Sequence, residues 1–185
     1  MRLNPETIRL PDGRALTLRS AGPDDAAAMI EYLNLISAET HFLTRWPEEA
    51  ARDYSPEKET GFLQAIADAP NRMMLTLFDA AGRVAGNAGL HPHAPTEKER
   101  HRADLGVALI RDYWHLGLGS LLLDRAILEA RRMGYEQLEL SVFSGNARAL
   151  ALYRRKGFLE CGRTPKAFKL RDGSYEDDVL MYLPL

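Results

Sequence analysis

The sequence predicts a mixed α/β domain in which helices flank a central, mainly antiparallel sheet. Segments typical of strands outnumber helical ones, and short turn signals join most of them in pairs. One strand–helix–strand unit, residues 102–142, makes the sheet mixed rather than purely antiparallel. With 185 residues and no linker or repeat, the chain is expected to form a single domain, residues 1–185.

Turn and cap residues mark the first elements. An Asp12-Gly13 turn precedes an alternating segment at residues 16–19, which is expected to be a strand reached through a hairpin-like lead-in. A proline at position 23 followed by two aspartates is typical of a helix start, and this helix is expected to run toward Ile36. Residues 40–46 carry aromatic and basic side chains without a clear period, so they are expected to be irregular.

A second helix is expected to begin at Ser55 and Pro56, with Phe62, Leu63 and Ile66 on its inner face. The remaining elements follow in chain order: strands at residues 73–79 and 83–91, a loop at 92–99, a strand at 102–110, a helix at 117–133 closed by Gly134, a strand at 137–142, a helix at 146–156 ended by Gly157, and closing strands at 159–163 and 175–183.

Composition argues against several classes of protein. The formal net charge of −2 gives no sign of a nucleic-acid-binding surface. No apolar stretch reaches the length needed to span a bilayer, so no membrane partner is expected. The N-terminus lacks the apolar core of a signal peptide, and the single cysteine, Cys161, allows no internal disulfide. A cytoplasmic location is the simplest expectation.

Two glycines lie where an apolar strand leads into an amphipathic helix. The connecting segment is Tyr113-Trp114-His115-Leu116-Gly117-Leu118-Gly119-Ser120. The first turn of a helix has unpaired N–H groups and a partial positive charge, and glycine lets a phosphate approach the backbone closely. By itself the segment fits a phosphate-binding loop or a plain tight turn equally well.

A second segment, residues 146–158, changes this balance. Together the two segments resemble the GNAT acetyltransferases, which transfer an acetyl group from acetyl-coenzyme A to an amine. The family's pyrophosphate loop reads Arg/Gln-x-x-Gly-x-Gly/Ala, and residues 114–119 occupy it here, with Trp114 where Arg or Gln is usual. The second motif, Asn-x-x-Ala-x-x-Leu-Tyr-x-x-x-Gly-Phe, is matched at Asn146, Ala149, Leu152, Tyr153, Gly157 and Phe158. The resemblance is strong over residues 105–158 and looser elsewhere.

The resemblance implies a GNAT-type fold, in which the strands around Leu109 and Leu140 splay apart to admit the cofactor. It also implies acetyl-CoA as co-substrate, with backbone N–H groups of the glycine loop on the pyrophosphate and main-chain groups of the preceding strand on the pantetheine arm. The residues expected to bind acetyl-CoA are Leu109, Ile110, Trp114, His115, Leu116, Gly117, Leu118, Gly119, Ser120, Asn146 and Tyr153.

Acetyl transfer needs a neutral amine, a donor for the carbonyl oxygen and a proton for the leaving thiolate. The resemblance assigns the last role to Tyr153, since a phenol is a donor at neutral pH, although Tyr153 could instead simply pack beside Leu152 and Phe158. Asp104, on the strand that enters the glycine loop, is the catalytic candidate for proton acceptor, with a paired surface charge as the alternative. Further candidates for proton relay or acceptor binding are His91, His115 and Glu39.

Three smaller features have both a structural and a functional interpretation. Asn146 can cap the helix that it precedes or contact the cofactor. The basic run at residues 154–156 can be a solvated helix face or a phosphate contact. His91 and His93 could share one face and bind a metal, but no third ligand is evident at a suitable spacing, so no metal site is predicted.

These observations predict an N-acetyltransferase that acts on a primary amine of a small molecule or amino acid, by direct attack in a ternary complex. A protein or peptide N-acetyltransferase is the alternative within the class, and a non-catalytic CoA-binding sensor is the alternative outside it. A nucleotide-binding α/β protein would favour a third glycine and a mostly parallel sheet, and neither is evident. A homodimer is compatible with the sequence, which carries no interface signature.

Overall fold

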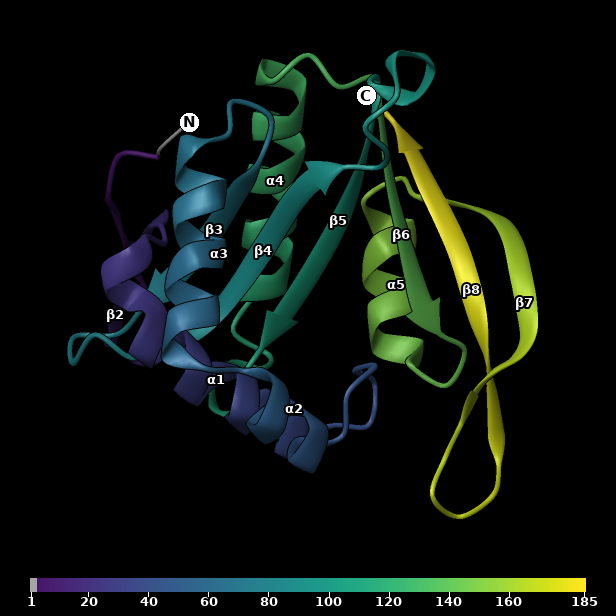
Figure 1. The fold of residues 1–185 in the computed structure, drawn as a ribbon, viewed down its shortest axis with the longest axis horizontal. Helices are drawn as coiled ribbons and strands as arrows, with labels where there is room; N and C mark the ends of the chain where they lie inside the picture. The colour runs from purple at the N-terminus through teal and green to yellow at the C-terminus, as the bar shows by residue number, and fades with distance from the viewer. Residues whose placement is uncertain (1–2) are drawn as a thin grey trace.

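The fold is organised around an eight-stranded sheet with the order β1-β2-β3-β4-β5-β6-β8-β7. A computed structural model describes residues 3–185 (Figure 1). The strands are β1 (Glu6–Arg9), β2 (Ala15–Ser20), β3 (Met73–Phe78), β4 (Val84–Pro92), β5 (Arg102–Leu109), β6 (Gln137–Phe143), β7 (Leu159–Lys169) and β8 (Tyr175–Pro184).

Within this sheet, β5 and β6 form the parallel pair, and each of the other neighbouring pairs is antiparallel. The mixed, mainly antiparallel sheet that the sequence predicts is therefore confirmed. The parallel pairing covers Arg102–Asp104 against Gln137–Glu139 and then stops, although both strands continue. Beyond that point β5 and β6 diverge, as Figure 1 shows, so the expected splay is also confirmed.

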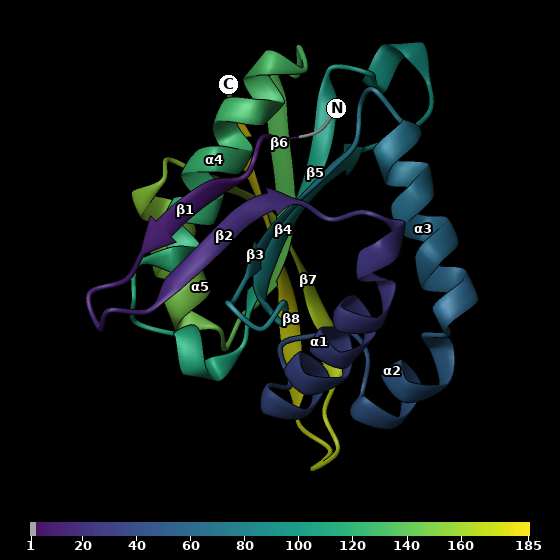
Figure 2. The same cartoon turned by 90° about the vertical axis from the view of Figure 1, so that its left-hand side faces the viewer.

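Helices cover both faces of the sheet. Figure 2 shows α1, α2 and α3 on one face and α4 and α5 on the other, with the sheet between them. Their bounds are α1 (Ala26–Glu39), α2 (Pro47–Asp53), α3 (Pro56–Asp68), α4 (Leu118–Arg132) and α5 (Ala147–Arg155), with 3₁₀ turns η1 (Pro23–Asp25), η2 (Glu97–Glu99) and η3 (Arg111–Tyr113). None of the described helices is long and apolar enough to cross a membrane.

Each face has its own hydrophobic core, and burial of its apolar surface stabilises the fold. Fully buried leucines of α4, Leu122 and Leu123, pack in the larger core with side chains from the central strands. On the other face, Met29 and Tyr32 of α1 pack in a second core with Leu63 of α3.

The structure corrects three details of the predicted elements. Phe62 was expected on the inner face of α3 but is 46% exposed, and Glu59 is buried on that helix instead. Pro47–Asp53 forms a helix after the segment predicted to be irregular. The strand predicted at residues 159–163 extends to Lys169, because it pairs with β8 along most of its length even though its side chains are largely exposed.

Candidate active site

A cleft of about 300 Å³ opens where β5 and β6 diverge. Side chains and backbone from α1, the following loop, β5, the glycine loop, α4 and α5 line it. The lining residues are Ile36, Thr40, Phe42, Leu43, Val107, Ala108, Leu109, Trp114, His115, Gly117, Gly119, Ser120, Asn146, Arg148, Ala149, Leu152, Tyr153 and Arg155. The two sequence motifs, which are separated along the chain, therefore meet at one site.

The glycine loop delivers the N-terminus of α4 to this cleft. Gly117 precedes the helix with φ +77°, a left-handed conformation that glycine adopts without steric cost. The helical hydrogen bonds begin with Leu121 N–H donating to Gly117 O at 3.1 Å, so the N–H groups of residues 118–120 have no partner within the helix. Together with the helix dipole, these N–H groups form an anion-binding terminus.

Gly119 lies at the tightest point of the loop. A Cβ at this position would lie 3.3 Å from Leu152 Cδ2 and 3.5 Å from Leu109 Cδ1. The glycine therefore allows α4, α5 and β5 to approach one another at the cleft. Of the neighbouring loop residues, Leu118 is buried at 2% exposure and Leu116 packs against the core, and neither lines the cleft with its side chain.

Trp114 supplies a flat aromatic wall in place of the usual Arg or Gln. Its indole N–H donates to Leu109 O at 2.8 Å, which fixes the orientation of the ring. Arg148 of α5 lies over this ring, with its guanidinium carbon 3.5 Å from the ring centroid. Among the described residues, Arg148 has no carboxylate partner, and partial burial lowers its pKa. The sequence did not single out Arg148, because only the fold brings α5 against the glycine loop.

The edge of β5 that faces the cleft pairs with no neighbouring strand beyond Asp104, although Leu109 O on this edge accepts from the Trp114 indole. Ile110 N–H donates to Ala85 O at 3.1 Å, so its amide is directed toward β4 and is not available to the cofactor as expected. In an antiparallel pair the direction of the main-chain groups alternates, so Val107 and Leu109 turn theirs toward the gap between β5 and β6. Val107 thus takes the place that the sequence assigned to Ile110.

Tyr153 contributes a nearly buried phenol to the cleft. Its side chain is 8% exposed, and its hydroxyl has no hydrogen-bond partner among residues 3–185. Burial raises the pKa of Tyr153 to about 12, so the hydroxyl remains protonated at neutral pH. The ring also packs near Phe158, with 5.7 Å between ring centroids, so the packing interpretation is confirmed and the role as proton donor stays a prediction.

Asn146 caps α5 and also lies at the cleft. Its Oδ1 accepts from Ala149 N–H at 3.1 Å, which is a helix N-cap, and the residue lines the cleft. Within the basic run, Arg155 lines the cleft, whereas Lys156 pairs with Asp124 at 2.7 Å and Arg154 lies 3.4 Å from Glu160.

Three of the residues predicted to transfer a proton or bind the acceptor lie outside the cleft. Asp104 is at the opposite end of β5, where its Oδ1 lies 2.8 Å from His93 Nδ1, and it does not line the cleft. His91 is beside Asp104 and is also outside the cleft. Glu39 accepts from Arg111 N–H at 2.7 Å and joins the end of α1 to η3. The structure therefore brings most of the expected cofactor residues together, apart from Ile110, Leu116 and Leu118. Of the candidates for proton transfer other than Tyr153, it places His115 at the cleft but not Asp104, His91 or Glu39.

The features of the cleft define a class of protein. An anion-binding helix terminus, an open strand edge and a free phenol fit an enzyme that binds an extended, phosphorylated co-substrate and transfers a group from it. A family model described as the acetyltransferase (GNAT) family matches residues 36–158. The chain belongs to this family and is an acyl-CoA N-acetyltransferase, with acetyl-CoA as co-substrate.

Individual relatives agree with this assignment. The chain is 34% identical over 125 residues to L-methionine sulfoximine/L-methionine sulfone acetyltransferase of Pseudomonas paraeruginosa, which covers 66% of this chain and 72% of that protein. It is 38% identical over 79 residues to the ribosomal protein bS18-alanine N-acetyltransferase of Escherichia coli, covering 43% of this chain and 53% of that protein.

Solved structures extend the similarity to the whole fold. A GNAT-family acetyltransferase from Streptococcus pneumoniae has a TM-score of 0.85 and 32% identity, and the match covers 92% of this chain and 99% of that one. The yncA protein of Salmonella typhimurium, solved with its cofactor acetyl-CoA, has a TM-score of 0.78 at 24% identity, over 92% of this chain and 94% of that one. At that identity the second match supports the fold alone.

Proposed function

We propose that this enzyme transfers the acetyl group of acetyl-CoA to the primary amine of a small molecule or amino acid. The amine attacks directly in a ternary complex. The observation that carries the proposal is the cleft, into which an anion-binding helix terminus, an unpaired strand edge and a free phenol all open. The thioester supplies an activated acyl group, so no nucleophile on the protein is needed. Accordingly, Cys161 is exposed and lies outside the cleft.

Backbone groups are proposed to hold the co-substrate. The N–H groups of Leu118, Gly119 and Ser120 suit its pyrophosphate, and the main-chain groups of Val107 and the N–H of Leu109 suit the amides of its pantetheine arm. These groups are fixed by the fold before binding, which limits the entropy lost on association.

Tyr153 is proposed to protonate the departing thiolate. Its raised pKa keeps the hydroxyl protonated throughout the physiological range, and the lack of a protein partner leaves its proton available. A general acid at this point makes the sulfur a better leaving group.

The proton acceptor is proposed to be His41, positioned by Glu176. His41 does not itself line the cleft, but Thr40 and Phe42 on either side of it do, and its Nε2 lies 3.2 Å from Glu176 Oε1. Glu176 is itself fixed by Gly145 N–H at 2.7 Å. Neither neighbour of Asp104 lines the cleft, so the position of Asp104 does not support its predicted role. If His41 is the acceptor, His41→Gln should lower kcat by about 10²–10⁴. A variant with the wild-type rate would argue against it.

The choice of acceptor class rests on the relatives and on the wall of the cleft. The relative that acetylates methionine sulfoximine is matched over 72% of its length, and the ribosomal-protein acetyltransferase over 53%. Near the cleft, the Phe143 ring stacks on Phe168 with 3.7 Å between centroids, and Phe42 packs against Phe143 edge-on at 6.0 Å. Phe42 of this cluster lines the cleft together with Thr40 and Leu43, and an apolar wall there favours a compact acceptor.

A thiol-release assay with a panel of amines tests the function. Methionine sulfoximine, methionine sulfone and free amino acids are compared with a peptide that begins with alanine. We expect turnover with one or more of the small amines, and we expect Tyr153→Phe to lower kcat by about 10²–10⁴ while leaving acetyl-CoA affinity unchanged. Because the pKa of Tyr153 is about 12, this loss should be the same from pH 6 to pH 9. Tyr175→Phe, an exposed tyrosine, is the matched control.

Other outcomes distinguish the alternatives. Turnover with the peptide alone would favour a peptide N-acetyltransferase. Acetyl-CoA binding without thiol release from any amine would favour a sensor. A Tyr153→Phe variant with the wild-type rate would show that another group protonates the thiolate.

A further inference from the structure

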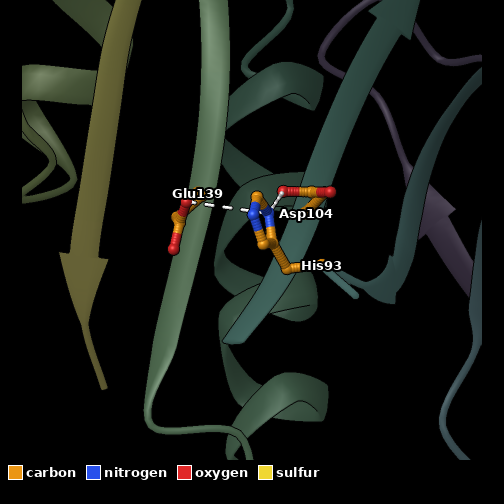
Figure 3. Close-up of side chains that lie close together, drawn as sticks. All are labelled: His93, Asp104 and Glu139. Atoms are coloured by element: carbon orange, nitrogen blue, oxygen red, sulfur yellow. Dashed lines mark hydrogen bonds and ion pairs between the residues drawn. The ribbon is translucent and has the colours of Figure 1, made fainter. Parts of the chain in front are cut away.

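Two imidazoles and two carboxylates meet at the end of the sheet where β5 and β6 still pair. In the sheet register, His91 of β4 lies opposite Asp104 of β5, and Asp104 lies opposite Glu139 of β6. His93 follows His91 by two residues and extends the ladder, since its N–H donates to Arg102 O at 3.1 Å. Figure 3 shows the His93 ring directed between the Asp104 and Glu139 carboxylates.

The distances suit a single small cation. His93 Nδ1 lies 2.8 Å from Asp104 Oδ1 and 3.7 Å from Glu139 Oε2, and His91 Nδ1 lies 3.7 Å from Asp104 Oδ2. One ligand atom from each of His93, Asp104 and Glu139 lies within 4.8 Å of the other two. Ligands around one tetrahedral zinc ion lie about 3.3 Å apart, so these three residues need only small side-chain movements. His91 is not part of that close group and must turn further toward it to become the fourth ligand.

The surrounding groups orient one of the carboxylates. Arg102 holds both oxygens of Glu139, with its Nη2 2.7 Å from Oε2, and Gln137 donates to Oε1 at 2.7 Å. A carboxylate oxygen has more than one acceptor site, so Oε2 can accept from Arg102 and still bind a metal. Carboxylate ligands of metals are commonly hydrogen-bonded in this way by a surrounding shell.

The local charge matches a divalent ion. Three carboxylates, those of Glu99, Asp104 and Glu139, surround the single guanidinium of Arg102, which lies 3.3 Å from Glu99. With neutral imidazoles the cluster carries two uncompensated negative charges. The positive charge of Arg102 opposes a cation, but two carboxylates already pair with it.

We propose that His91, His93, Asp104 and Glu139 form a zinc site with a structural role. Two imidazoles and two carboxylates are a donor set that Zn²⁺ accepts with tetrahedral geometry. The ion would join β4, β5 and β6 at the end of the sheet where β5 and β6 still pair. The site is separate from the acetyl-transfer chemistry, since none of these four residues lines the cleft.

Zinc calorimetry on chelator-treated, untagged protein tests the proposal. We expect one equivalent of Zn²⁺ to bind the wild type, and one equivalent of Co²⁺ to give the intense visible absorption of a tetrahedral complex. His93→Ala should weaken zinc binding at least tenfold. His101→Ala, which removes a nearby imidazole outside the cluster, should bind zinc as the wild type does. Zinc should also raise the unfolding temperature of the wild type and His101→Ala, but not of His93→Ala.

Three results would overturn the site: no zinc binding by the wild type, wild-type affinity in His93→Ala, or an equal loss in His101→Ala. Circular dichroism establishes that each variant is folded. If His93→Ala is not, Asp104→Asn replaces it, since asparagine keeps the shape of the side chain. These measurements use the metal without acetyl-CoA, so their failure leaves the proposed acetyl transfer untouched.

Discussion

Arg148 of α5 supplies a positive charge beside Trp114, which stands where the family has an Arg or Gln. The family pattern has an Arg or Gln at position 114, and the aromatic side chain here cannot supply that charge. Arg148 lies on the indole at 3.5 Å and has no carboxylate partner among the described residues, so its positive charge is directed into the cleft. A guanidinium stacked on an indole is held in place while its N–H groups stay free to bind phosphate. We therefore expect Arg148 to contact the pyrophosphate.

Arg148→Met should weaken acetyl-CoA binding about tenfold, which is typical of one lost hydrogen bond to a charged group. The same factor is expected for 3′-dephospho-acetyl-CoA, because the pyrophosphate is present in both ligands. Calorimetry measures the two affinities. Arg131→Met is the control, since Arg131 is an exposed arginine at the far end of α4.

A loss confined to acetyl-CoA would instead place Arg148 at the 3′-phosphate, and equal affinities would remove it from the site. Trp114→Arg in the Arg148→Met background gives a further check. It should recover most of the lost affinity, since it returns a cation to the loop position.

At the scale of elements, the N-terminus of α4 carries most of the expected phosphate binding. Gly119→Glu places a carboxylate in front of the free N–H groups and adds bulk where a Cβ already meets Leu152 at 3.3 Å. We expect acetyl-CoA affinity to fall at least a hundredfold by calorimetry, because the carboxylate repels the pyrophosphate and competes for the same donors. Gly61→Glu, at an exposed site on α3 with no atom near its Cβ position, adds the same charge and should bind normally. Equal affinity in the two variants would contradict the placement of the phosphate.

The elements that the sequence predicts well are those with local signals. Ser55 caps α3 through a 3.3 Å bond from Lys58 N–H, and Gly134 and Gly157 end α4 and α5 with φ of +82° and +91°. The inner face of α3 was predicted less well, since Phe62, expected on that face, is exposed and Glu59 is buried. The spacing of apolar residues predicts the buried face of a helix only approximately. Packing against α1 and β3 decides which residues of α3 are buried.

The same distinction applies to the site. The glycine loop, Asn146 and Tyr153 could be predicted because each belongs to a contiguous motif. Asn146, Tyr153 and both glycines of the loop line the cleft. Val107 and Arg148 were missed, because strand register and helix packing place them there. Asp104 was placed in the site by its nearness in sequence to the loop. The extended strand in fact carries it away from the cleft, since each residue of a strand adds about 3.3 Å.

At the scale of the whole molecule, one buried carboxylate opposes the stability of the fold. Glu59 is 5% exposed, and its Oε1 has no hydrogen-bond partner in residues 3–185. Burial raises the pKa of Glu59 above its ordinary value of 4.5. The protonated form is therefore favoured in the folded state. Below pH 4.5 Glu59 is protonated in both the folded and the unfolded state, and its burial carries no charge penalty. The free energy of unfolding then falls as the pH rises through the raised pKa.

Glu59→Met should therefore stabilise the protein at neutral pH, by on the order of 1 kcal/mol, since methionine fills a similar volume without a charge to bury. The gain over the wild type should shrink as the pH falls from 7 toward 4, where Glu59 becomes protonated. Urea unfolding at several pH values measures the free energy of unfolding of both proteins. Glu57→Met is the matched control on the same helical turn. Hydrogen bonds from its own N–H and from Ser55 lower the pKa of Glu57, so its loss should not stabilise the fold at pH 7. A Glu59→Met protein whose advantage did not change with pH would mean that the carboxyl is protonated across the whole range or has a partner in solution.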